Sequence, residues 1–228
     1  MSDFFIYYGL TIIALIITIG AQIFISSTYS KYKKVNNNRG ISGAEAARTI
    51  LDNNGLSDIR IEPVSGYLSD HYDPSSKVVR LSRDNYYGKT IGSVAVASHE
   101  CGHAIQDKDN YTFMRIRSSL VPLVNFSSYA GYFAILIGCL LGFLDLIWIG
   151  IIFEVVILLF QLVTLPVEID ASSRALKKIE EYDLLTKEEK KSGRTVLTAA
   201  ALTYVASVAT AIIQILRLVL IYGNRDDR

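Results

Sequence analysis

His99, Glu100 and His103 are the residues of this chain whose types and spacing could do chemistry. They form the pattern H-E-x-x-H, and on an α-helix positions i and i+4 lie on the same face. Two imidazoles at that spacing can hold one Zn²⁺, and the glutamate between them then lies beside the metal as a general base. The pattern therefore predicts a zinc hydrolase site with His99 and His103 as metal ligands and Glu100 as the catalytic base.

A catalytic zinc ion usually takes three protein ligands and leaves a fourth position open for water. Glu168 is the preferred third ligand, because it directly follows a long apolar segment. Asp170 is the alternative ligand, or a partner that orients a histidine. His71, the third histidine of the chain, could also serve as a ligand. His71, Tyr67 and Tyr72 are candidate hydrogen-bond donors to the oxyanion. For His71, stabilisation of a turn is the more ordinary interpretation.

Four long segments contain few or no charged residues, and each could cross a hydrocarbon core, which takes about 20 residues of helix. They are residues 4–30, 118–144, 146–167 and 195–222. Buried helices of a large soluble protein are the alternative, but too little polar sequence would remain to cover them. The net charge of +1 gives no argument for nucleic acid as a partner. We therefore expect a mostly α-helical membrane protein with four transmembrane helices in contact with lipid.

Lys and Arg are distributed unevenly along the chain. Thirteen of the 23 lie in residues 31–117 and seven in residues 168–194, while none precedes the first span. The positive-inside rule places both basic segments in the cytoplasm and both chain termini outside. Glu168 then lies on the same side of the membrane as the H-E-x-x-H residues. Glu154 and Arg217 lie inside predicted spans at similar depth, which predicts an ion pair between them.

The first cytoplasmic segment has the pattern of a small α+β domain. Ser42-Gly43-Ala44-Glu45 is a capping box that opens a helix, and residues 58–64 and 77–82 alternate as strands do. Residues 69–74 are rich in turn formers, and Thr90 opens the helix that carries H-E-x-x-H. Strand 77–82 could present a free edge to an extended peptide, or be an ordinary hairpin strand. The expected fold is a zincin-like domain attached to four transmembrane helices.

These residues lie in motifs that resemble the YugP-like family of bacterial membrane zinc metallopeptidases. The motifs are Asp70 to Pro74, Lys77 to Ser82, His99 to Gln106 and Leu165 to Ser172, and the resemblance covers nearly the whole chain. It implies a zinc endopeptidase of the bacterial plasma membrane that cleaves protein or peptide substrates at the cytoplasmic face, in quality control or processing of membrane proteins.

A more distant resemblance to the HtpX-like gluzincins implies that Glu168 completes the zinc site. Those relatives usually carry an aspartate four residues later, where this chain has Ser172. A non-catalytic zinc-binding membrane scaffold is the alternative function, but a scaffold would have no need for Glu100. A small transporter is a third candidate, and the scarcity of polar side chains in the predicted spans argues against it. The residues predict no oligomeric state.

Overall fold

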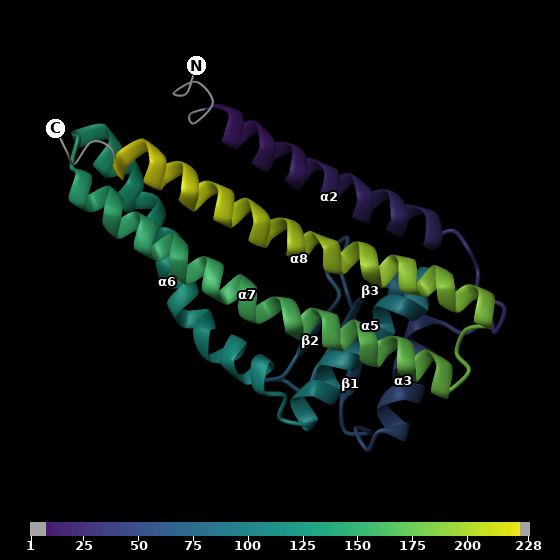
Figure 1. Cartoon of the computed structure of the whole chain (residues 1–228). Coiled ribbons are helices and arrows are strands. Elements are labelled where there is room, and N and C mark those ends of the chain that lie inside the picture. Colours follow the sequence, from purple (N-terminus) through teal and green to yellow (C-terminus); the bar gives the residue numbers. More distant parts are fainter. Residues whose placement is uncertain (1–7, 224–228) are drawn as a thin grey trace. The chain divides into compact units, whose positions relative to one another are not determined.

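The computed structural model describes residues 8–223 (Figure 1). Residues 4–7 of the predicted first span, and the two termini predicted to lie outside, are not among the described residues. The helices and strands are α2 (Leu10–Tyr32), α3 (Gly43–Asn53), β1 (Arg60–Val64), β2 (His71–Asp73), β3 (Val78–Ser82), α4 (Arg83–Tyr87), α5 (Ile91–Lys108), α6 (Thr112–Leu141), α7 (Leu144–Glu181) and α8 (Lys187–Tyr222).

The chain divides into two compact units. Within the described residues the first unit comprises 8–22, 115–165 and 203–223, and the second comprises 23–114 and 166–202. Helices α2, α6, α7 and α8 contribute residues to both units, and each is long and apolar enough to cross a membrane. The prediction of a mostly helical chain with four long apolar helices is confirmed.

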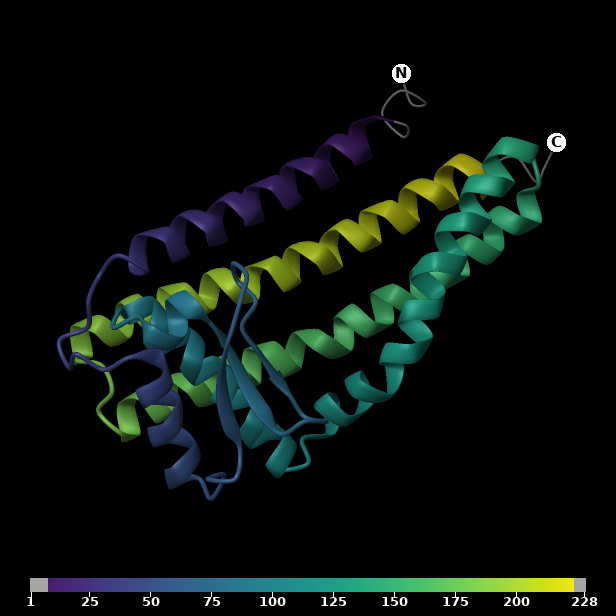
Figure 2. The same ribbon diagram turned by 180° about the vertical axis from the view of Figure 1, so that it is seen from behind.

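In the first unit, α6 and α7 pack closely as an antiparallel pair (Figures 1 and 2). A Cβ atom added at Gly138 would lie 2.6 Å from Cγ1 of Ile147, and one added at Gly150 would lie 2.4 Å from Cγ1 of Ile135. Only glycine leaves room for such an approach. Gly142, with φ +75°, makes the turn between the two helices, because glycine adopts that backbone conformation without steric cost.

The predicted ion pair between Glu154 and Arg217 is wrong. Arg217 donates from Nη1 to Oγ1 of Thr11 at 3.2 Å, and no ion pair joins it to Glu154 within residues 8–223. A threonine hydroxyl of α2 therefore takes the place of the expected carboxylate as a partner of the guanidinium group.

The second unit contains a three-stranded sheet in the order β1-β3-β2. β3 is parallel to β1, with Val79 opposite Ile61, and antiparallel to β2, with Val79 also opposite Tyr72. The prediction of a free sheet edge at residues 77–82 is wrong, because β3 has a partner on each side. Residues of β3 are buried almost throughout, as a central strand requires.

The prediction of a turn over residues 69–74 is wrong for residues 71–73, which form β2. The turn begins only after this strand, where the Asp73 carboxylate accepts hydrogen bonds from the backbone N–H groups of Ser75 and Ser76 at 2.9 and 3.2 Å. The turn-forming residues thus stabilise the connection between β2 and β3. Tyr72 in the middle of β2 is buried, and an aromatic residue with a buried ring favours a strand at this position.

Local signals set the starts of the two helices beside the sheet. The Ser42 hydroxyl accepts from the backbone N–H of Glu45 at 3.2 Å, and the Glu45 carboxylate accepts from the backbone N–H of Ser42 at 2.6 Å, which is the predicted capping box of α3. Thr90 accepts from the backbone N–H of Ser93 at 3.1 Å and so caps α5. Residues 99–103 lie in the middle of α5.

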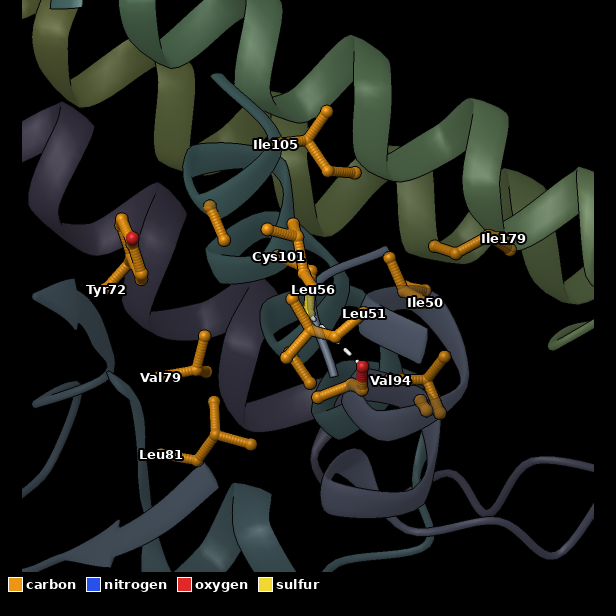
Figure 3. Packing of buried hydrophobic residues seen from close by; sticks show 14 of the residues in the cluster. Ile50, Leu51, Leu56, Tyr72, Val79, Leu81, Val94, Cys101, Ile105 and Ile179 are labelled. Atoms are coloured by element: carbon orange, nitrogen blue, oxygen red, sulfur yellow. Dashed lines mark hydrogen bonds between the residues drawn. The ribbon is translucent and has the colours of Figure 1, made fainter. Parts of the chain in front are cut away.

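The core of the second unit fixes the rotation of α5 about its axis. Figure 3 shows Cys101 of α5 among apolar side chains of the sheet and of α3, and its Sγ lies 3.6 Å from the carbonyl oxygen of Ala47. Burial raises the pKa of this thiol far above its usual range. Successive residues of a helix are about 100° apart, so Cys101 points away from His99 and His103. The core therefore turns both imidazoles away from the sheet.

Candidate metal centre

The close approach of α5 to α7 brings together residues that are far apart in the sequence. A Cβ atom added at Gly102 would lie 2.5 Å from the carbonyl oxygen of Ala171, so a glycine is required where the two helices touch. α7 continues without a break through Pro166, and Val167 and Ala171 are fully buried. This packing places the α7 residue Glu168 against the histidine face of α5.

His99, His103 and Glu168 form a cluster of three potential metal ligands. Oε2 of Glu168 lies 3.3 Å from Nε2 of His99 and 3.6 Å from Nε2 of His103. One ligand atom from each of the three residues lies within 4.8 Å of the other two, and the imidazole rings are nearly perpendicular, at 82°. Atoms about 2.1 Å from a tetrahedral zinc ion lie roughly 3.4 Å from one another. Two imidazole nitrogens and one carboxylate oxygen at these distances fit zinc.

Glu100 lies beside this cluster and is 7% exposed. Burial raises the pKa of its carboxyl group, while the positive charges that His99 and His103 can carry oppose the shift. Its carboxylate forms no hydrogen bond with any residue of the described chain. Glu100 is therefore available to accept a proton from a solvent molecule without first giving up a protein partner.

The pKa of His103 reflects the same cluster of charges. Burial lowers the pKa of its imidazole, but the nearby carboxylates of Glu168 and Glu100 outweigh burial, so the pKa lies above the usual value for histidine. Metal ligands must be deprotonated, so protons and a metal ion compete for this imidazole.

Ser172 lies next to the cluster of ligands. Its Oγ lies 3.2 Å from Nδ1 of His99, on the side of the ring away from Glu168. An outer partner at this nitrogen orients a metal-binding imidazole. Ser172 therefore occupies the position at His99 where the more distant relatives were expected to have an aspartate.

Asp170 and Gln106 form a second outer contact, at His103. Nδ1 of His103 lies 3.0 Å from Oε1 of Gln106, and Nε2 of Gln106 donates to Oδ2 of Asp170 at 2.8 Å. Asp170 also accepts from Nε of Arg174 at 2.6 Å, and it is not a member of the three-ligand cluster. Gln106 was not among the predicted site residues. Its position three residues after His103, on the same helix face, is the signal that could have identified it.

His71, Tyr67 and Tyr72 have no hydrogen bond or ion pair with the cluster within the described chain. His71 is exposed on β2, with Nδ1 2.8 Å from the carbonyl oxygen of Ser69. Tyr72 donates to Asp107 at 2.9 Å, and the exposed Tyr67 ring stacks edge-on against Tyr29. In place of a ligand, each of these side chains contacts a residue outside the cluster.

The chain matches the family described as "Putative neutral zinc metallopeptidase" over residues 7–223. It belongs to that family. A relative from Bacillus subtilis, "Putative membrane protease YugP", is 46% identical over 222 residues, which cover 97% of this chain and 99% of the relative. No solved structure matches the chain. The resemblance to YugP-like metallopeptidases is confirmed, and membership of this metallopeptidase family agrees with a donor set that fits zinc.

Proposed function

We propose that this chain is an integral-membrane zinc-dependent endopeptidase of the bacterial plasma membrane, with its active site at the cytoplasmic face. The observation that carries the proposal is the cluster of His99, His103 and Glu168, whose ligand atoms lie within 4.8 Å of one another beside the buried Glu100. The metallopeptidase family and the Bacillus subtilis relative support the same function.

In the proposed mechanism, Nε2 of His99, Nε2 of His103 and a carboxylate oxygen of Glu168 would hold the metal. Bound zinc would supply a Lewis acid that polarises the scissile carbonyl group and acidifies water. Glu100 accepts the proton of the attacking water and returns it to the leaving amine. Asp170 acts through Gln106 as an orienting group, and the mechanism assigns no step to His71, whose ring contacts Ser69 and Arg80.

The cytoplasmic orientation rests on the distribution of Lys and Arg. Residues 31–117 and 168–194 carry 20 of the 23 basic residues, which favours their retention on the cytoplasmic side. The proposed zincin-like domain then consists of the sheet, α3 and α5, completed by the part of α7 that carries Glu168. Its substrates would be misfolded or membrane proteins, and lipid would surround the apolar helices.

A non-catalytic zinc-binding scaffold is the competing function. Such a protein would need the three ligands but not a general base. Glu100 lies next to the ligands and forms no hydrogen bond with any described residue, so its carboxylate is available to act as a base, which a scaffold would not need. Glu100 therefore favours the peptidase over the scaffold.

The test uses the full chain purified in detergent. We expect about one zinc ion per chain, cleavage of an unfolded protein substrate, loss of cleavage with a chelator, and recovery when zinc is added back. Zinc binding without cleavage of any substrate tried would favour the scaffold. A protein that purifies and folds without affinity for zinc would contradict both functions.

A further inference from the structure

We infer that Gln106 is a positioning residue that holds the ring proton of His103 on Nδ1, and thereby turns the lone pair of Nε2 toward the metal position. The inference rests on the proposed metal-binding role of His103 and does not depend on catalysis. It follows from the hydrogen-bond partners on both ends of one buried side-chain amide.

The hydrogen-bond partners of the Gln106 amide fix its orientation. Its Nε2 lies 2.8 Å from the carbonyl oxygen of Val167 and 2.8 Å from Oδ2 of Asp170. A carbonyl oxygen and a carboxylate oxygen can only accept, so this end of the amide must be the NH₂ group. An inverted amide would place an oxygen against two acceptors in a site where Gln106 is 0% exposed and water cannot compensate.

The oriented amide in turn fixes which ring nitrogen of His103 carries the proton. Oε1 of Gln106 lies 3.0 Å from Nδ1 of His103, and an amide oxygen can only accept. Nδ1 must therefore carry the hydrogen. A neutral imidazole has one ring proton, so Nε2 is left with its lone pair free. Nε2 is also the nitrogen that lies 3.6 Å from Glu168, on the metal side of the ring.

Two residues of α7 hold the Gln106 amide in this orientation. Asp170 accepts from Nε of Arg174 at 2.6 Å, and Nη1 of Arg174 donates to Asp109 at 2.5 Å. The ion pairs hold the Asp170 carboxylate in place, and Asp170 in turn holds the Gln106 amide. His99 has no equivalent constraint, because the Ser172 hydroxyl beside its Nδ1 can either donate or accept.

Two substitutions at Gln106 separate this role from simple packing. Gln106→Glu in its protonated form keeps an oxygen acceptor facing Nδ1 of His103 and one O–H donor facing Asp170, whereas Gln106→Met keeps the approximate volume and removes both. We expect Gln106→Met to weaken zinc binding by about 10- to 100-fold, as loss of an outer partner of a metal ligand does. Gln106→Glu should bind zinc more tightly than Gln106→Met. If Gln106 only filled space, Gln106→Met should bind zinc more tightly than Gln106→Glu, because methionine packs better than a carboxyl group in a buried site.

Zinc dissociation constants are measured by competition with a chromophoric chelator, and thermal unfolding of the metal-free variants reports whether they fold. Gln161→Met is the matched control, since it makes the same change at an amide whose Oε1 is buried without a partner. It should leave zinc affinity unchanged. If Gln106→Met also binds zinc as tightly as the wild type, the inference is overturned. A wild type that binds no zinc would overturn both the inference and the proposed function.

A spectroscopic measurement tests the inference on the unmutated chain, even if the variants fail to fold. The protein has only three histidines, so ¹⁵N-histidine labelling of the zinc-loaded form gives few signals, and His71→Gln removes one of them. We expect the protonated nitrogen of His103 to be Nδ1, with slow exchange of its hydrogen. Zinc bound at Nδ1, with the proton on Nε2, would overturn the inference.

Discussion

Glu168 and Asp170 are two residues apart on α7, yet their contacts indicate different functions. Glu168 is 3% exposed and faces Nε2 of both histidines, whereas Asp170 is bound by Gln106 and Arg174. A carboxylate that already accepts from an amide and a guanidinium group has less capacity to bind a metal ion. The contacts therefore favour Glu168 as the third ligand.

Exchanging each carboxylate for its amide tests this assignment. Glu168→Gln should weaken zinc binding by more than about 100-fold, because a ligand is lost, while Asp170→Asn should cost roughly 10-fold through the weaker hold on Gln106. Chelator competition on the purified variants measures both. A larger loss for Asp170→Asn than for Glu168→Gln would show that Asp170 is the ligand.

How much of the site could be predicted at this scale depends on sequence distance. His99 and His103 are one helical turn apart, so their spacing alone indicates a shared face. Glu168 lies 69 residues beyond His99, and only charge distribution and family resemblance suggested it. Gln106 was missed although it lies one turn after His103, because its second contact, with Asp170 of α7, is distant in the sequence.

At the scale of elements, the site depends on how closely α5 approaches α7. The Gly102 position has no room for a Cβ atom, because the obstacle is the backbone carbonyl oxygen of Ala171 rather than a flexible side chain. Ala171 is three residues from Glu168 on the same helix. A shift of α7 at this point would move the third ligand with it.

Gly102→Ala should therefore impair both folding and metal binding. Overpacking costs about 1–3 kcal/mol, and the better helix propensity of alanine returns up to about 1 kcal/mol. We expect lower thermal stability in detergent and weaker zinc binding. Gly20→Ala in α2 is the control, since nothing lies within 4 Å of its added Cβ atom, and it should lower neither stability nor zinc affinity. Wild-type zinc affinity in Gly102→Ala would argue against this account of the helix contact.

The elements themselves were predictable where their signals are local. The Ser42–Glu45 capping box and the Thr90 cap lie within one turn of the helices that they begin. Sheet order was not predictable in the same way, because β1 pairs with β3 in parallel and the chain between them forms β2. Neighbouring strands in the sequence suggested a hairpin, and only the pairing shows that β3 is central.

At the scale of the whole molecule, the central prediction is orientation in the membrane. The basic residues of 31–117 favour the cytoplasm, and the turn between α6 and α7 has no Lys or Arg to hold it there. Phe143 in that turn and Ser76 in the β2–β3 connection are both exposed in the structure. They are suitable positions for reporters on opposite sides of the membrane.

Cysteine labelling tests the orientation directly. In a Cys139→Ser background, Phe143→Cys should react with a membrane-impermeant thiol reagent in intact cells, while Ser76→Cys should react only after lysis. The natural Cys101 is buried and should stay unreactive while the protein is folded. Labelling of Ser76→Cys in intact cells would place the proposed active site outside and contradict the cytoplasmic assignment.

The most direct test of the account is a substitution of Glu100 that separates metal binding from substrate cleavage. Glu100→Gln keeps the three ligands and removes the base, so it should retain zinc while cleavage falls by about 10²- to 10⁴-fold. Glu188→Gln makes the same change at an exposed residue of α8 and should retain both properties. Full chelator-sensitive cleavage by zinc-loaded Glu100→Gln would contradict the proposed mechanism.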